Sequence, residues 1–168
     1  MNLIVNVFKI HLKGYIMDHT TDFKSRSLAR ISESKCEEYL DSNNILYKRF
    51  GWDYVIDKIP GNQFIKLPET MRSLPDYIVF QNKAFFLEVK GCNDFLRLKI
   101  CDMKSYSLWN MIMDLYFFIY SSIKNKIYKL SYKDMNDISR YCKVEVYENN
   151  NKHYYKIDVN KLEQKQKG

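Results

Sequence analysis

Three charged side chains, Asp76, Glu88 and Lys90, interrupt two apolar runs in the segment LPDYIVFQNKAFFLEVKG, residues 74–91. Two carboxylates within a few ångströms repel each other unless one is protonated or a cation lies between them. A hard divalent ion such as Mg²⁺ binds one or two carboxylates and completes its shell with water and phosphate oxygens. The residue types therefore predict a metal site that could hydrolyse phosphodiesters. Lys90 would orient the water or stabilise the developing charge, and the backbone carbonyl of Val89 could be a further ligand.

This site requires a turn of suitable length between the two strands. Alternate residues of a strand share a face, so Glu88 and Lys90 point the same way. A three-residue loop, for example 82–84, places Asp76 opposite Lys90 and Ile78 opposite Glu88. A two-residue loop sends Asp76 to the wrong face. The metal site therefore predicts that the loop between the two strands has an odd number of residues, or that the hairpin contains a bulge.

The alternative is an ordinary hairpin in which Glu88 and Lys90 form an exposed ion pair worth well under about 1 kcal/mol. Such a hairpin would alternate polar residues along the whole of one face. Apolar residues flank the charges instead, namely Ile78, Phe80 and Phe86. This pattern favours the metal site.

The elements around the hairpin follow from apolar periodicity and from turn residues. We expect helices over 24–43, 103–114 and 133–142. We expect strands over 45–57, 74–81, 85–91, 115–122 and 126–132. Residues 143–159 should form two further strands, joined as a hairpin by a turn at 148–151. The segment 58–73 is typical of a loop, and 92–104 of an irregular or partly extended connection. The continuous apolar run 115–122 indicates a strand buried on both faces and paired centrally.

This order predicts an α/β domain with a central four-stranded mixed sheet flanked by helices and a C-terminal β-hairpin extension. The length of 168 residues predicts one domain over 24–168, with a core at 24–122 and an extension at 123–168. Residues 1–23 would be an N-terminal extension or an extra strand. Their apolar start is a weak signal peptide and no membrane span, so we expect a cytoplasmic protein, in the host cytoplasm if the source is a phage or virus.

The motif PDYIVF…FFLEVK, with Asp76 twelve residues before Glu88-Val89-Lys90, resembles the signature of the PD-(D/E)xK nuclease superfamily. The resemblance covers residues 24–122 and implies a restriction-endonuclease-like fold. It also implies a Mg²⁺-dependent DNA endonuclease, with Mn²⁺ as a substitute, that leaves a 5′-phosphate. The layout is similar to archaeal-type Holliday junction resolvases and to small phage or virus endonucleases. A resolvase cuts two strands symmetrically, so a homodimer is expected.

The resemblance further implies an acidic metal ligand from the first helix. Glu33 is the first choice, because Cys36 and Leu40 follow it at i+3 and i+7 and share its helix face. Glu37 is the alternative, and both could equally be solvated helix residues.

Such nucleases also contact DNA from the start of the second helix. Lys104 matches this position best, followed by Ser105 and Tyr106, with Arg97 and Lys99 in the preceding connection.

Charge and composition agree with a polyanionic partner. Lys and Arg number 27 against 20 Asp and Glu, for a net charge of +7. Many of the lysines lie in the last third, where a solvated face is the alternative. The four cysteines show neither zinc-ligand nor disulfide spacing, nor that of an iron–sulfur cluster. We expect no small-molecule cofactor and no membrane partner.

Several alternatives remain open at the level of sequence. The substrate could be a branched junction, a duplex cut at a specific sequence, or single-stranded ends. The rival to an enzyme is a catalytically silent nuclease-fold domain that uses the same basic surface to bind DNA or a protein partner. The presence of Asp76, Glu88 and Lys90 together argues for the enzyme.

Overall fold

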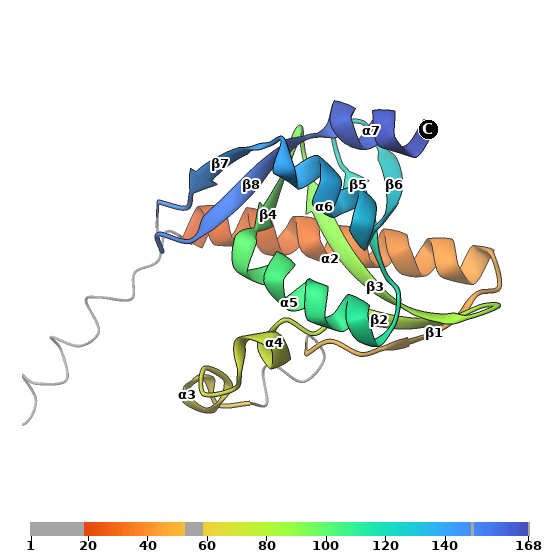
Figure 1. Ribbon diagram of the computed structural model, residues 1–168, viewed down its shortest axis with the longest axis horizontal. Helices are drawn as coiled ribbons and strands as arrows, with labels where there is room; N and C mark the ends of the chain where they lie inside the picture. The colour runs from red at the N-terminus through yellow and green to blue at the C-terminus, as the bar shows by residue number, and fades with distance from the viewer. Residues whose placement is uncertain (1–18, 53–58, 149, 168) are drawn as a thin grey trace, which may run out of the picture.

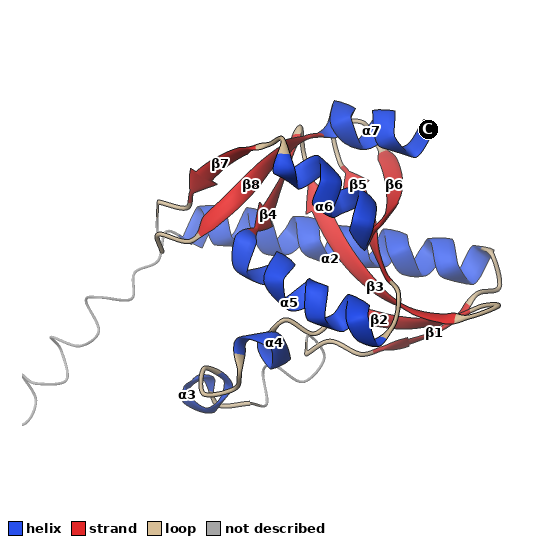
Figure 2. Cartoon of the chain, viewed as in Figure 1, coloured by secondary structure: helices blue, strands red, loops and turns tan. Residues whose placement is uncertain are grey.

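Strands with alternating or continuous apolar residues form a mixed sheet through the middle of the chain. The computed structural model describes residues 19–52, 59–148 and 150–167. Its larger sheet has five strands in the order β1-β2-β3-β5-β6, namely β1 (Leu46–Arg49), β2 (Tyr77–Phe80), β3 (Ala84–Cys92), β5 (Leu115–Ser121) and β6 (Lys126–Ser131) (Figure 2). β3 and β5 are parallel, and the other neighbours are antiparallel. The α/β class and the mixed sheet are therefore confirmed.

The number of strands differs from the four expected. β1 and β6 both pair in the larger sheet. A second sheet has the order β4-β8-β7, formed by β4 (Phe95–Lys99), β8 (His153–Asp158) and β7 (Lys143–Val146). The expected connection at 92–104 thus contains a strand, and the C-terminal hairpin pairs with that strand. Strand β8 of the hairpin pairs with the edge of β4, and the local sequence pattern could not specify this partner.

Helices cover both faces of the larger sheet (Figure 1). They are α2 (His19–Ser42), α3 (Gly61–Phe64), α4 (Glu69–Arg72), α5 (Ile100–Ile112), α6 (Tyr132–Arg140) and α7 (Val159–Lys167). Cys36 and Leu40 of α2 pack on one face, against a core that includes Val79 and Val89. α5, α6, α7 and the smaller sheet share the core on the opposite face.

Several boundaries differ from the sequence prediction. α2 begins at His19, so the expected extension over 1–23 overlaps a helix, and residues 1–18 lie outside the described part. β1 ends at Arg49, and residues 53–57 of the expected strand 45–57 also lie outside the described part. The expected loop at 58–73 carries α3 and α4, and the residues after β8 form α7.

Helix α2 packs closely against strand β3 at Gly91, the residue that follows Lys90. A Cβ atom at Gly91 would lie 2.9 Å from the carbonyl oxygen of Leu28 and would collide with the Ser32 hydroxyl. Ser32 is fully buried and donates to the Leu28 carbonyl at 2.7 Å. The helix can therefore lie this close to the strand only because residue 91 has no side chain.

Candidate active site

The β2–β3 hairpin places the two motif carboxylates on one face. Tyr77 pairs with Leu87 and Phe80 with Ala84, which leaves the three-residue loop 81–83. The odd-numbered loop is confirmed. One further step of this register brings Asp76 opposite Glu88, and both line the same cavity.

The register itself differs by two residues from the example drawn from the sequence. Ile78 pairs with Phe86 and not with Glu88, and Asp76 lies opposite Glu88 and not Lys90. The difference arises because Ala84 still pairs with Phe80, so the loop starts one residue earlier. The face of Asp76 is unchanged, because moving the register by two residues preserves the alternation.

Glu88 lies at the centre of a hydrogen-bonded cluster. Its side chain is 4% exposed. Its Oε1 accepts hydrogen bonds from the Tyr106 hydroxyl at 2.5 Å and from the Lys90 ammonium. Its Oε2 is buried and makes no hydrogen bond within the described part of the chain. One carboxylate oxygen thus accepts two hydrogen bonds, whereas the other has no donor among these residues.

Asp76 is fixed through both its side chain and its backbone. Its Oδ2 accepts from the Val89 backbone N–H at 2.6 Å. Its carbonyl accepts from the N–H groups of Phe50 at 2.8 Å and of Gly51 at 3.1 Å. A Cβ on Gly51 would lie 3.3 Å from the Asp76 Cα, so the backbone there is tightly packed. These contacts hold the carboxylate at the start of β2.

Burial and charge set the protonation of the cluster. Burial raises the pKa of Glu88, and Lys90 and Tyr106 counteract this only in part. Burial alone would lower the pKa of Lys90, but the Glu88 carboxylate outweighs it and raises that pKa well above its ordinary value. Burial, followed by the charge of Glu88, likewise raises the pKa of Tyr106. Lys90 is therefore an ammonium and Tyr106 a neutral donor at neutral pH.

The cluster opens into a cavity of about 320 Å³. Three acidic and three basic side chains line it, together with three aromatic residues, a serine and a leucine: Asp76, Glu88, Asp102, Arg72, Lys90, Lys99, Trp52, Phe64, Tyr106, Ser73 and Leu74. The segment that carries α3 and α4 forms one wall, next to α5 (Figure 1). The hairpin, α5 and this segment thus meet at one polar site.

The donor set suits a hard divalent cation. Asp76 and Glu88 offer carboxylate oxygens, and the buried Glu88 Oε2 lacks a hydrogen-bond donor among the described residues. Mg²⁺ binds proteins through one or two carboxylates and keeps water or phosphate oxygen in its other positions. Within the described ranges, no three His, Cys, Asp or Glu side chains gather as a metal site. These residues therefore fit a metal site with two carboxylate ligands, in which the other coordination positions are open to water and phosphate.

Glu33 does not join these two carboxylates. Its Oε2 lies 3.3 Å from Nη1 of Arg49, and it does not line the cavity. Glu37, the alternative, lies 2.8 Å from Nη2 of Arg49 and also accepts from the Tyr77 hydroxyl at 3.0 Å. Glu33 and Glu37 thus both pair with Arg49 of β1, and a metal-ligand role for Glu33 stays a prediction without support from this arrangement.

The predicted nucleic-acid contacts divide between the cavity and the surface. Lys99 lines the cavity, whereas Lys104 is exposed on α5. Arg97 is exposed on β4, with its guanidinium carbon 5.7 Å from the centre of the Tyr154 ring. Tyr106, another of the predicted contacts, lines the cavity. It is only 2% exposed and donates to Glu88, because apolar packing turns that face of α5 inward.

Two charged cavity residues, Asp102 and Arg72, were absent from the site predicted from the sequence. Asp102 lies in the first turn of α5, and Arg72 is the last residue of α4. The helical period of α5 puts Asp102 at i−4 from Tyr106, which could have indicated a shared face. No local pattern places Arg72, because its position depends on how the 59–74 segment packs against α5.

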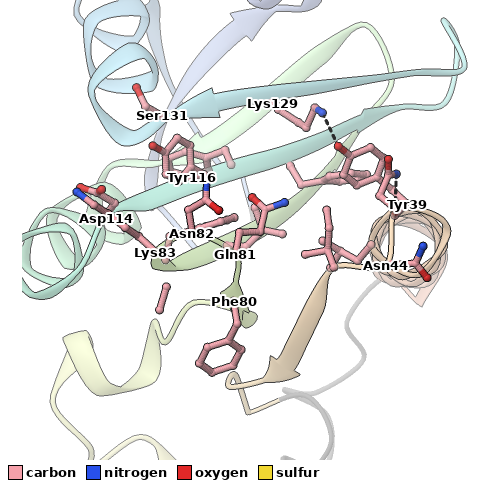
Figure 3. A pocket seen from close by; sticks show the side chains of 18 of the residues that line it. Tyr39, Asn44, Phe80, Gln81, Asn82, Lys83, Asp114, Tyr116, Lys129 and Ser131 are labelled. Carbon is pink, nitrogen blue, oxygen red and sulfur yellow. Dashed lines mark hydrogen bonds between the residues drawn. The ribbon is translucent and has the colours of Figure 1, made fainter.

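A larger cavity of about 1000 Å³ lies near the β2–β3 turn (Figure 3). The end of α2, the turn and the starts of β3 and β5 line it. There the Lys129 ammonium donates to the Tyr39 hydroxyl at 2.8 Å. None of the predicted site residues lines this cavity.

No protein-family model matches the chain, and no curated protein sequence matches it significantly. Nine chains of solved structures match it, and two of them are described here. One is Hjc, a Holliday junction resolvase from the archaeal hyperthermophile Archaeoglobus fulgidus, with 14% identity, a TM-score of 0.48, and coverage of 81% of this chain and 88% of that chain. The other is a nuclease from a fusselovirus, with 8% identity, a TM-score of 0.44, and coverage of 88% and 92%.

Within the described residues, no helix is long and apolar enough to cross a membrane.

Proposed function

We propose that this chain is a divalent-metal-dependent nuclease that hydrolyses DNA phosphodiester bonds. The observation that carries the proposal is the joint placement of Asp76, Glu88 and Lys90 in one polar cavity, with a buried Glu88 oxygen that lacks a donor in the described part. Mg²⁺, or Mn²⁺ in its place, would be held by Asp76, Glu88 and the Val89 carbonyl. When bound, the ion polarises the phosphoryl group and lowers the pKa of a water.

Residues of the chain itself would orient the two carboxylates and stabilise the developing negative charge. The Val89 N–H fixes Asp76, and Tyr106 and Lys90 fix one oxygen of Glu88, so both carboxylates are oriented before substrate binds. Lys90, charged and only 26% exposed, can donate to the attacking water or to the phosphoryl oxygens as negative charge develops. Because these hydrogen bonds already orient the carboxylates, little reorganisation would be needed during the reaction.

Nicking of supercoiled plasmid in Mg²⁺ or Mn²⁺ tests the proposal. Asp76→Asn should lower the rate by at least about 100-fold, because a group that stabilises the transition state is removed. Asp114→Asn is the matched control, since Asp114 is an exposed aspartate that lines the other cavity. Equal nicking by wild type and Asp76→Asn would refute the enzyme and favour a silent nucleic-acid-binding or protein-binding domain.

The finer proposal is a structure-specific endonuclease that acts as a homodimer. It follows from the sequence resemblance to junction resolvases, whose paired cuts require two sites related by symmetry. A four-way junction should be cut faster than a linear duplex of the same sequence, and sedimentation should give a mass near twice the 20.3 kDa of one chain. Equal cutting of both substrates, or a monomer on the junction, would contradict this part alone.

A further inference from the structure

Arg72 is a cationic side chain of the cavity for which the described residues provide no partner. Its Nε is buried and makes no hydrogen bond, and no carboxylate forms an ion pair with it in the described part of the chain. A guanidinium group presents several N–H donors in a planar fork that matches phosphate. A buried donor left unsatisfied is costly, so this position favours an anion.

Two indole rings hold Arg72 at the cavity wall. The Trp52 Nε1–H donates to the Met71 carbonyl at 2.6 Å, and the Trp109 Nε1–H donates to the Thr70 carbonyl at 3.2 Å. Both acceptors belong to α4, which ends at Arg72. The side chain is therefore presented from an anchored segment that ends at the cavity.

Lys99 supplies a second cation to the same cavity. It is half-buried at the junction of β4 and α5 and has no carboxylate within ion-pair distance among the residues described. Lys90, by contrast, is already paired with Glu88. Within the described ranges, Arg72 and Lys99 are thus two cations of the cavity that form no ion pair, and both lie beside the predicted cleavage site.

An aromatic wall completes this side of the cavity. The rings of Trp52 and Phe64 lie edge to face with centroids 5.9 Å apart, and both residues line the cavity. The base of an unpaired nucleotide can stack on such rings, whereas bases inside a duplex are covered by their neighbours. The volume of about 320 Å³ is at the small end for ligand pockets, which suits a single nucleotide.

We propose that Arg72 and Lys99 bind a phosphate adjacent to the scissile one, and that the base of an unpaired nucleotide stacks on Phe64 and contacts the perpendicular ring of Trp52 at its edge. This inference rests on the proposed nuclease function and narrows its substrate. The site selects DNA with unpaired nucleotides beside the cut, either in single strands or in the opened part of a branched molecule. Fully paired duplex lacks a base that can reach the aromatic wall.

Binding measured without divalent metal separates the subsite from cleavage. Fluorescence anisotropy of a labelled oligothymidylate of about 12 nucleotides, in EDTA, should give a Kd raised about fivefold or more in Arg72→Gln. The slope of log K against log salt should flatten by roughly 0.7 for each phosphate of the single strand that the variant no longer binds. Arg140→Gln is the control, because Arg140 is exposed on α6 and outside the cavity, and it should stay within about twofold.

The aromatic wall is tested with a matched probe. A chain of abasic residues of the same length keeps the phosphates but removes the bases. Phe64→Leu should weaken binding of oligothymidylate and leave binding of the abasic chain unchanged. Equal weakening on the two probes, or no weakening on either, would overturn the stacking role.

The binding and cleavage measurements distinguish an absent phosphate subsite from an absent nuclease activity. Arg72→Gln with the same Kd and salt slope as Arg140→Gln overturns the phosphate subsite, even if the wild type cleaves DNA. A wild type that binds but does not cleave overturns the proposed function and leaves the binding result valid. If thermal melting shows that Arg72→Gln is unfolded, Lys99→Gln provides the same test, and an unchanged Kd there overturns the inference.

Discussion

The hydrogen bond from Tyr106 to Glu88 makes a residue outside the motif part of the candidate site. Tyr106 reaches the carboxylate from α5, eighteen positions along the chain. Its donor stabilises the ionised carboxylate and lowers the pKa of Glu88, which burial raises. The ionisation of Glu88, on which the proposed metal site rests, therefore depends on a helix that the strand motif does not include.

Tyr106→Phe should shift the acidic limb of the pH–activity profile to higher pH. Removal of the hydrogen bond raises the pKa of Glu88, so more of the carboxyl is protonated at a given acidic pH. The rate at the acidic end should fall on the order of tenfold, equivalent to about 1.5 kcal/mol for a hydrogen bond to a charged group. The measurement is plasmid nicking in Mg²⁺ as a function of pH.

The control for this variant is Tyr141→Phe, because Tyr141 is 84% exposed on the surface. An unshifted acidic limb in Tyr106→Phe would show that the hydrogen bond does not set the ionisation of Glu88. A fall in rate that is equal at every pH would assign Tyr106 a purely structural role.

At the scale of elements, the approach of α2 to β3 at Gly91 should be sensitive to a single methyl group. Gly91→Ala places a Cβ against Ser32 and the Leu28 carbonyl, so either the helix or the strand must shift. Overpacking of this kind costs about 1–3 kcal/mol of unfolding free energy. Urea denaturation should show the decrease.

Gly61→Ala provides the comparison, because a Cβ there would meet nothing within 4 Å. A Gly91→Ala protein as stable as Gly61→Ala would mean that the helix and the strand are not packed this closely in solution.

The attachment of α7 to β6 should depend on pH. Glu163 accepts from Lys126 at 2.5 Å and from Lys124 at 3.4 Å, and these bonds lower the pKa of Glu163 to about 2. A lowered pKa in the folded state stabilises the fold above the unfolded value of 4.5, and this stabilisation disappears as the pH falls toward 2. Glu163→Gln should therefore lower the Tm at pH 7. The Tm difference between this variant and wild type should shrink as the pH falls from 4.5 toward 2.

Glu148→Gln is the matched control, since Glu148 is exposed outside these contacts. A Tm difference for Glu163→Gln that persists unchanged down to pH 2 would rule out the carboxylate as its source.

For the whole molecule, the net charge of +7 predicts binding to DNA that weakens with salt. If about three phosphates of a single strand are contacted, the affinity should fall roughly 20-fold between about 50 and 200 mM salt. Anisotropy titrations at several salt concentrations measure the slope. A flat dependence would show that the basic residues do not form the binding surface.

Much of the fold follows from local pattern. The helix at α2, the hairpin of β2 and β3, and the buried strand β5 were predicted because apolar periodicity is set by neighbouring residues. The second sheet was not predicted, because the pairing of β4 with β8 joins segments about sixty residues apart, and local periodicity does not specify such partners. The short helices α3 and α4 lack an apolar period long enough to detect.

The sequence alone was enough to propose the chemistry, because the types and spacing of Asp76, Glu88 and Lys90 suit only a few tasks. Only the tertiary structure decided which other groups meet them. It brought Tyr106 onto Glu88 and Arg72 to the cavity wall, and it turned Glu33 toward Arg49. The physical reason is that strand alternation is a local property, whereas the partners of a buried charge depend on the packing of distant segments.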